Sequence, residues 1–472
     1  MISFKYIESR LTSAKKTVLL LFITVCSLSC LAENNGIDLT LIPPTLITNK
    51  VDLDIRVGIK NNENSCQDAS IYIYLNKEDH GSLLYHTKVN LGKRQSHTEK
   101  FIMPTANRAG RNKIIAVVRS KNISQRVSRD ITIVESPYRS TGLIDGAWAG
   151  IYHWSEVEGK HWNKDIKKMT DGQWQELVYS MHKLKMDIIV IQEVFRNEFY
   201  VGKHELNIDN YQGKAFYPSK IYPKRMDITA KDPVEAILNQ ADKLGMHVFV
   251  GVGMFAWFDF TNASLEWHKR IAKELWDMYG KHPSFYGFYI SEESGGSLDN
   301  WEKDEQMRVK RKKDIVHFFK EFKSYCNELA PSKPIMLATN SMQVPAGLDT
   351  YPALLENLDI LCPFGFARMP KDDITGKEAA DLLQNVCNKT GSHLWFDLES
   401  FLFNKDNSLY PRPMNEILKD LNSFRNFEKI LCYQFPGVFN DPKMSIRIGE
   451  ESTVKLYLDY QNYLKNKSIK NQ

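Results

Sequence analysis

The chain is poor in cysteine and has no cysteine pair at metal-binding spacing. Seven of its 472 residues are cysteine, and five of them lie beyond the first 32 residues. An odd number without a CxxC motif predicts neither a disulfide framework nor a zinc site. Several lie in apolar runs, which predicts buried thiols. The five are Cys66, Cys326, Cys362, Cys387 and Cys432.

Features that would indicate a nucleic-acid partner or a bound cofactor are also missing. The 62 basic and 57 acidic residues leave a net charge of only +5, and no DNA- or RNA-binding motif is present. No glycine-rich phosphate loop follows the first, seventh or eighth expected strand. No HxH pair or His/Asp cluster ends a strand, because His247 and His393 begin theirs. We therefore expect no nucleic-acid partner, no cofactor and no metal.

Residues 1–32 are predicted to be an export leader. Lys15 and Lys16 precede an apolar run from Val18 to Cys30, and no later run is long and apolar enough to span a bilayer. Cleavage after Ala32 would release a soluble protein. A loose lipobox at Ser29-Cys30 would instead leave Cys30 as a lipidated N-terminus, the alternative we slightly favour. The expected location is the periplasm, the outer membrane or the cell surface, with the lipid as the sole membrane attachment. We expect a monomer.

Residues 35–136 are predicted to form an all-β, immunoglobulin-like sandwich. Short runs alternate apolar and polar residues, as in VDLDIRVGI from Val51 and SIYIYL from Ser70, and polar clusters separate them. The region offers no catalytic constellation, so an accessory role is expected.

Residues 139–465 repeat a strand–helix rhythm eight times. Such a repeat over about 300 residues predicts an α/β fold, a (β/α)8 TIM barrel, and the missing phosphate loop disfavours a doubly wound open sheet. The expected strands begin at Ile144, Asp187, His247, Tyr286, Pro334, Asp359, His393 and Ile430.

Two glutamates are predicted to face the barrel axis at the carboxyl ends of strands. Active sites of TIM barrels lie at that end, and strand side chains alternate between the helices and the axis. In the seventh strand this alternation turns Trp395, Asp397 and Glu399 inward. In the fourth it turns Tyr289, Ser291 and Glu293 inward and Glu292 toward the helices, unless the strand ends or bulges at that point. Glycoside hydrolysis needs two such carboxyl groups. We expect Glu293 to be the acid/base and Glu399 the nucleophile, with Glu292 in reserve for the acid.

A resemblance supports this interpretation. Glutamates at the ends of strands four and seven resemble those of the largest clan of retaining TIM-barrel glycoside hydrolases, although Ser291 stands where that clan usually has asparagine. Residues 139–440 also resemble an uncharacterised family of exported bacterial barrels assigned as glycoside hydrolases, through GLIDGAWAG, FYGFYISEE and CYQFPGVFN. The resemblance implies a barrel and glycosidase activity on an unidentified oligo- or polysaccharide. It covers none of the sandwich.

Other inward or rim residues are candidates for binding the sugar. Aromatic rings stack on sugars, amides bond their hydroxyl groups, and an arginine could meet an acidic sugar. A catalytically inactive glycan-binding barrel and a metal-dependent hydrolase remain alternatives. The candidates are Tyr289, Trp395, Gln192, Glu193, Asn340, Gln434, Trp154, Trp257, His153 and Arg368.

Overall fold

The N-terminal region consists of two β-sheets that share one core. The computed structural model describes residues 36–121, 124–197 and 206–470, so the expected leader lies outside it. One sheet has the order β1-β3-β6 and the other β2-β8-β7-β4-β5. Apolar side chains of both sheets, such as Ile55 and Ile71, form a single buried cluster, as the alternating pattern requires. This arrangement is compatible with the predicted sandwich, whose immunoglobulin-like topology stays a prediction. The strands are β1 (Ile37–Ile42), β2 (Leu46–Thr48), β3 (Leu53–Lys60), β4 (Gln67–Leu75), β5 (Leu83–Leu91), β6 (Ser96–Met103), β7 (Gly110–Ser120) and β8 (Ser124–Val134).

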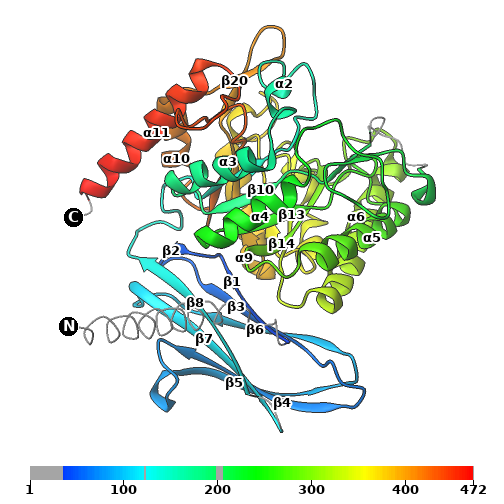
Figure 1. Cartoon of the computed structure of the whole chain (residues 1–472), viewed down its shortest axis with the longest axis vertical. Coiled ribbons are helices and arrows are strands. Elements are labelled where there is room, and N and C mark those ends of the chain that lie inside the picture. The colour runs from blue at the N-terminus through cyan, green and yellow to red at the C-terminus, as the bar shows by residue number, and fades with distance from the viewer. Residues whose placement is uncertain (1–35, 122–123, 198–205, 471–472) are drawn as a thin grey trace, which may run out of the picture.

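The rest of the chain is a mixed α/β region around a nearly closed, all-parallel sheet (Figure 1). Its order is β17-β16-β15-β14-β13-β10-β9-β21-β18. Only Trp395 separates β17 from β18, so these two strands together are the seventh predicted strand, and the ring is completed through that residue. This is a TIM-like barrel. Its strands are β9 (Gly146–Ala149), β10 (Ile188–Ile191), β13 (His247–Gly251), β14 (Phe285–Ser294), β15 (Ile335–Thr339), β16 (Ile360–Leu361), β17 (His393–Leu394), β18 (Phe396–Glu399) and β21 (Ile430–Tyr433).

Helices connect the strands and begin where the sequence places their caps. Thr170 and Gln173 form a capping box at the start of α3. Asp232 caps α4, with Pro233 in its first turn and the left-handed Gly245 at its end. No helix within the described ranges is both long enough and apolar enough to cross a membrane. The helices are α2 (Asn163–Ile166), α3 (Asp171–Lys183), α4 (Pro233–Leu244), α5 (Asn262–Tyr279), α6 (Glu305–Leu329), α7 (Val344–Gly347), α8 (Tyr351–Leu355), α9 (Gly376–Thr390), α10 (Met414–Ser423) and α11 (Glu451–Lys470).

Short elements occupy the loops at the carboxyl ends of the strands. Two small antiparallel pairs, β11 with β12 and β19 with β20, follow β10 and β18. The short 3-10 helix η3 follows β16 and carries Arg368. Their bounds are β11 (Phe195–Arg196), η2 (Ile208–Asn210), β12 (Lys214–Ala215), η3 (Phe366–Arg368), β19 (Phe401–Phe403) and β20 (Leu409–Pro411), while η1 (His80–Ser82) lies in the N-terminal region.

The barrel interior is filled by alternate strand residues. Trp148, Val190, Phe249, Tyr289 and Trp395 belong to one buried interior cluster. Their sequence neighbours, such as Ile191 and Ile290, pack in the larger cluster against the helices. The predicted inward positions of Tyr289 and Trp395 are therefore confirmed. The interior is a packed core, and chemistry is confined to its ends.

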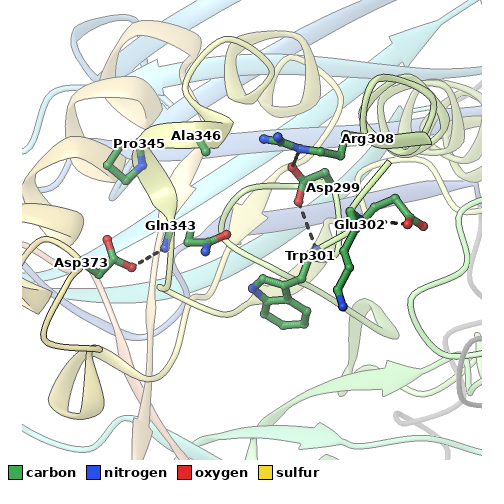
Figure 2. Close-up of a pocket in the computed structure, with 9 residues that line it drawn as sticks. Asp299, Trp301, Glu302, Arg308, Gln343, Pro345, Ala346 and Asp373 are labelled. Atoms are coloured by element: carbon green, nitrogen blue, oxygen red, sulfur yellow. Dashed lines mark hydrogen bonds and ion pairs between the residues drawn. The ribbon is translucent and has the colours of Figure 1, made fainter. Parts of the chain in front are cut away.

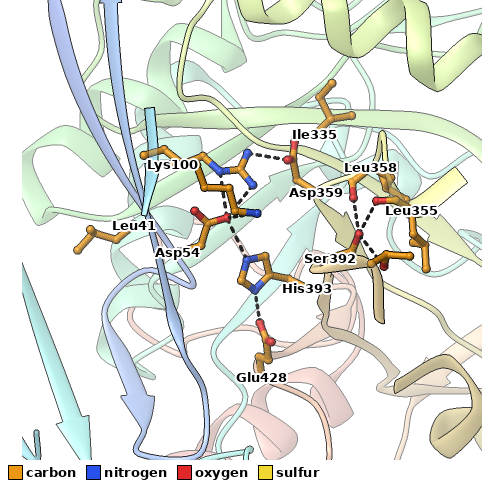
Figure 3. Close-up of polar contacts among 12 residues, drawn as sticks. Leu41, Asp54, Lys100, Ile335, Leu355, Leu358, Asp359, Ser392, His393 and Glu428 are labelled. Carbon is orange, nitrogen blue, oxygen red and sulfur yellow. Dashed lines mark hydrogen bonds and ion pairs between the residues drawn. The ribbon is translucent and has the colours of Figure 1, made fainter. Parts of the chain in front are cut away.

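The N-terminal sheets cover the amino-terminal ends of the barrel strands. Tyr286, at the start of β14, donates a hydrogen bond of 2.6 Å to the Leu41 carbonyl, and Ile42 joins the barrel's interior cluster. Figure 3 shows His393 between Asp54 and Glu428 in a buried network. Arg56 donates a hydrogen bond of 2.6 Å to Asp359 in the same network. This face of the barrel is therefore occupied, and the opposite, carboxyl-terminal face carries the candidate site.

Candidate active site

Two acidic side chains face the barrel mouth from strands four and seven. Glu293 is the ninth residue of β14 and Glu399 is the last residue of β18. Arg368 donates from Nε to Oε1 of Glu399 over 2.7 Å, and its charge also acts on Glu293. The loop after β16 therefore places the Arg368 guanidinium in contact with Glu399 and near enough to Glu293 for its charge to act on it.

Burial raises the pKa of both acids. Burial raises the pKa of Glu293 to about 7, with Glu158 and Glu193 adding to the rise and Arg368 opposing it. Burial also raises the pKa of Glu399, again opposed by the paired Arg368. A carboxyl group with a pKa near 7 holds a proton at neutral pH and can give it up, which is the requirement for a general acid.

A third acid, Asp397, lies beneath this pair. Asp397 stands two residues before Glu399 on β18, deeper in the barrel, and its side chain is buried. Burial, together with the charges of Glu399 and Glu293, raises its pKa well above the usual range. The alternation of side chains along the strand places Asp397 inward. It was left out of the predicted site because Glu399, and not Asp397, lies at the strand end.

Glu292 lies where the register of β14 against β15 is irregular, between Ile290 and Ser294, so simple alternation does not decide its direction. The side chain is fully buried and accepts hydrogen bonds from the Phe255 and Ala256 amides at 2.7 and 3.3 Å. Burial and the nearby Asp259 raise its pKa well above the usual value. Glu292 thus braces the loop after β13, on the far side of β14 from Glu293.

Several buried polar atoms near the mouth have no hydrogen-bond partner among the described residues. They include Gln192 Oε1 after β10, Gln434 Oε1 after β21, Asp397 Oδ1 and the Trp395 indole nitrogen. Buried polar groups are nearly always paired, so orphans gathered at one end of a barrel are a feature of a ligand site. Gln192 and Gln434 also meet across Gly150, where a Cβ would come within 2.8 Å of Gln434 Oε1.

The predicted Glu193 and His153 are engaged with protein groups. Arg196 donates to Glu193 and, over 3.0 Å, to the His153 carbonyl, so the ion pair holds the loop after β9. His153 Nε2 lies 3.0 Å from Glu158, and burial lowers the pKa of the imidazole. His153 Nδ1 lies 3.4 Å from the amide nitrogen of Gln434. Glu193, His153 and their partners therefore hold the loops around the barrel mouth and supply charged groups there.

Tyr289 and Trp395 form the floor of the site. Both are buried within the barrel interior, so neither offers an exposed ring face. Asn340, after β15, is also buried, and its Oδ1 accepts from the Met342 amide at 2.8 Å. Contact of these three residues with a substrate stays a prediction.

Aromatic rings form a row along one side of the mouth. Trp154 lies 5.1 Å from Trp257 between ring centroids, Trp257 stacks on Phe258 at 4.8 Å, and Phe258 meets Trp301 at 5.7 Å. Trp257 also acts on the Glu293 carboxyl group, whose pKa it lowers, so the row starts beside the acid pair. Phe258 and Trp301 were not predicted, because they lie in loops without periodic pattern.

Among the residues that the structure describes, no group of three or more His, Cys, Asp or Glu side chains could hold a metal ion. The site therefore offers the two glutamates, a third buried acid with a raised pKa, an arginine and aromatic surface. This set can transfer a proton, attack an electrophilic carbon and bind a polyhydroxylated ligand.

Comparison with known proteins identifies the barrel. A family model described as a domain of unknown function, DUF4434, matches residues 144–445. The chain belongs to the DUF4434 family. The matched residues span β9 to the loop after β21, and hence both glutamates. No curated protein matches the chain.

Solved structures resemble this DUF4434 protein at low sequence identity. A putative α-L-fucosidase of Bacteroides thetaiotaomicron has 16% identity and a TM-score of 0.52, covering 70% of this chain and 95% of that one. A Bacteroides uniformis β-glucuronidase has 13% identity and a TM-score of 0.42, covering 90% and 50%. A β-galacturonidase of Eisenbergiella tayi has 12% identity and a TM-score of 0.39, covering 87% and 69%. The first of these likenesses shows a common fold.

Proposed function

We propose that this protein is a retaining glycoside hydrolase with Glu293 as general acid/base and Glu399 as nucleophile. The observation that carries the proposal is the pair of inward acids at the ends of β14 and β18, with Arg368 acting on both. The orphaned polar atoms and the aromatic row beside the acids suit a sugar ring with its hydroxyl groups and apolar faces. The names of the solved structures with a similar fold agree with this class of reaction.

The reaction proceeds in two displacements. Glu293 gives its proton to the glycosidic oxygen while the Glu399 carboxylate attacks the anomeric carbon, so the bond to the leaving group breaks and a glycosyl ester forms. The Glu293 carboxylate then takes a proton from water, whose oxygen displaces Glu399 and releases the sugar with its configuration retained. The mechanism requires the two carboxyl groups about 5–5.5 Å apart, whereas inversion requires about 6.5–9.5 Å.

Arg368 and Asp397 give the two glutamates different tasks. The ion pair from Arg368 to Glu399 stabilises that side chain as a carboxylate, the form a nucleophile needs. Burial and the two glutamates raise the pKa of Asp397 well above its usual range, which favours its uncharged form next to the nucleophile. Glu293 carries no direct ion pair in the described structure and keeps its proton to a higher pH.

Replacing each glutamate by glutamine tests the proposal. Glu399→Gln should reduce turnover of aryl glycosides by about 10³-fold or more, because the nucleophile is lost while the shape is kept. Glu293→Gln should impair substrates with poor leaving groups far more than activated aryl glycosides, because only the former need protonation. Glu356→Gln, at an exposed position on the surface, is the matched control and should behave as wild type. Absence of turnover in the wild-type protein on a broad panel of aryl glycosides and polysaccharides would favour a glycan-binding barrel.

We further propose that the protein is an exported, monomeric lipoprotein that meets its carbohydrate outside the cytoplasm. The support is the basic and apolar leader that ends near Cys30. Labelling cells with a fatty acid should label the wild-type protein and not Cys30→Ser. A protein without label that begins at Glu33 would instead indicate ordinary secretion.

A further inference from the structure

A second pocket lies at the carboxyl-terminal face of the barrel, outside the acid pair. It has a volume of about 610 Å³, within the ~300–1,000 Å³ typical of small-molecule sites. Figure 2 shows its lining, which comes from the loops after β14, β15 and β16. Trp301, Gln343 and Asp373 represent these three loops. Such loops carry ligand contacts in TIM barrels, so its position alone makes the pocket a candidate site.

Trp301 is held over this pocket with much of its surface in solvent. The side chain is 41% exposed, and its backbone adopts the left-handed region with φ of 57°. A bulky residue rarely takes this conformation. The buried Asp299 accepts from the Trp301 amide at 3.1 Å and from Arg308 Nε at 3.0 Å, which fixes the loop. The ring also packs on Gly295, where a Cβ would lie 3.2 Å from it. The fold therefore keeps a large aromatic surface exposed at considerable local cost.

The aromatic row connects this pocket to the acid pair. It begins at Trp257, which neighbours Glu293, passes through Phe258 and ends at Trp301. Asn300 Nδ2 donates to the Phe258 carbonyl over 3.1 Å, so the loops after β13 and β14 are joined along the row. A chain of sugar rings that leaves the acid pair along this side would meet Trp301.

The charges of the pocket favour a neutral ligand. Three carboxylates and two cations line it, and Arg308 is already paired with Asp299. An anionic ligand would find no surplus positive charge. Besides its charged groups, the lining offers an indole face and the Gln343 amide, which suit the apolar face and hydroxyl groups of a neutral sugar.

We propose that this pocket is a distal subsite that binds a neutral polysaccharide chain through Trp301, several sugar units from the bond that is cut. The inference rests on the proposed function and deepens it, because it assigns the substrate class as an extended neutral glycan.

Binding in native gels tests the subsite apart from catalysis. The Glu399→Gln protein is run through gels that contain galactomannan, mixed-linkage β-glucan, arabinoxylan or, as the acidic comparison, polygalacturonate. We expect at least one neutral polymer to retard it. Trp301→Ala in the same background should weaken that retardation about tenfold or more, as removal of an anchoring tryptophan does elsewhere. Tyr138→Ala, which removes an exposed aromatic ring from the segment between the two regions, should not.

A second variant controls for loss of the loop conformation in Trp301→Ala. Ala346→Trp fills the pocket from the opposite loop and should weaken the retardation as well. Equal retardation of both variants and the parent, or no retardation by any neutral polymer, overturns the inference. Hydrolysis of aryl glycosides by the wild-type protein is measured separately. Activity without Trp301-dependent binding removes the subsite alone, whereas Trp301-dependent binding without activity removes the proposed hydrolase alone.

Discussion

The surroundings of Glu293 set the pKa of this side chain, and its protonation state should control activity. Burial raises its pKa to about 7, so the acid form prevails below that pH and is lost above it. We expect kcat/KM on substrates with poor leaving groups to fall as pH rises through about 7, while the acidic limb reports Glu399. Glu293→Gln should abolish the alkaline limb. A limb that persists in this variant would assign the acid to another group.

Arg368 should set the position of both limbs. Its charge lowers the pKa values of Glu293 and Glu399, against burial, which raises them. Arg368→Gln should therefore shift the whole pH–rate profile to higher pH and reduce its maximum. Arg270→Gln, at a partly exposed ion pair with Asp209, is the control and should leave the profile in place. An unshifted profile in Arg368→Gln would show that the guanidinium does not act on these acids in solution.

At the end of β14, the neighbouring residues Glu292 and Glu293 should have different roles, one structural and one catalytic. Glu292 holds the backbone amides of Phe255 and Ala256. Glu292→Ala leaves both donors buried without a partner and should lower the free energy of unfolding by roughly 2–5 kcal/mol. Glu292→Gln keeps an acceptor oxygen and should cost less than half as much. Denaturant unfolding measures both variants.

Activity of the same glutamine variant provides a further check. If Glu292 only braces the loop, Glu292→Gln keeps turnover near that of wild type, in contrast to Glu293→Gln. Loss of turnover with stability retained would move the acid role from Glu293 to Glu292.

Regular elements were predictable from sequence, whereas their interruptions and the loops were not. Strand periodicity predicted each barrel strand and the inward faces of Tyr289 and Trp395. The break between β17 and β18 at Trp395 was not predicted, because an interruption of one residue does not change the alternation of side chains along the strand. Trp301 was not predicted because its exposure depends on a loop conformation that the Asp299–Arg308 pair fixes, and no periodic pattern reveals such a pair.

For the whole molecule, the contact between the N-terminal sheets and the barrel depends on buried charges. Arg56 binds both Asp54 and Asp359, and Lys323 also pairs with Asp359. These partners hold the pKa values of Asp54 and Asp359 well below the usual range. Removing one partner of such a network leaves a buried charge uncompensated. Arg56→Met should therefore destabilise the protein by about 3–5 kcal/mol, measured by thermal or denaturant unfolding. A loss below about 1 kcal/mol would mean that water reaches these aspartates.

His393 gives this interface a pH dependence with a defined sign. It lies 2.6 Å from Glu428 and 3.4 Å from Asp54, and these carboxylates outweigh burial and raise its pKa from 6.5 to about 9. A raised pKa stabilises the folded state fully below the unfolded value of 6.5, and this contribution disappears as pH rises through about 9. The size is on the order of 3 kcal/mol. The aspartates act oppositely, since their lowered pKa values remove stability as the pH falls into the acid range.

His393→Gln should therefore be much less stable than wild type at pH 6, and the difference should shrink toward pH 9–10, where the native histidine has lost its proton. His182→Gln, in a half-exposed pair with Asp187 on α3, should change stability by less than about 1 kcal/mol at either pH. Denaturant unfolding at pH 6, 8 and 10 measures the three proteins. A His393→Gln deficit that stays constant across this range would show that the imidazole contributes packing and hydrogen bonds without its charge. A deficit that grows with pH would mean that His393 is neutral in the folded protein and that Arg56 and Lys100 neutralise Asp54 without it.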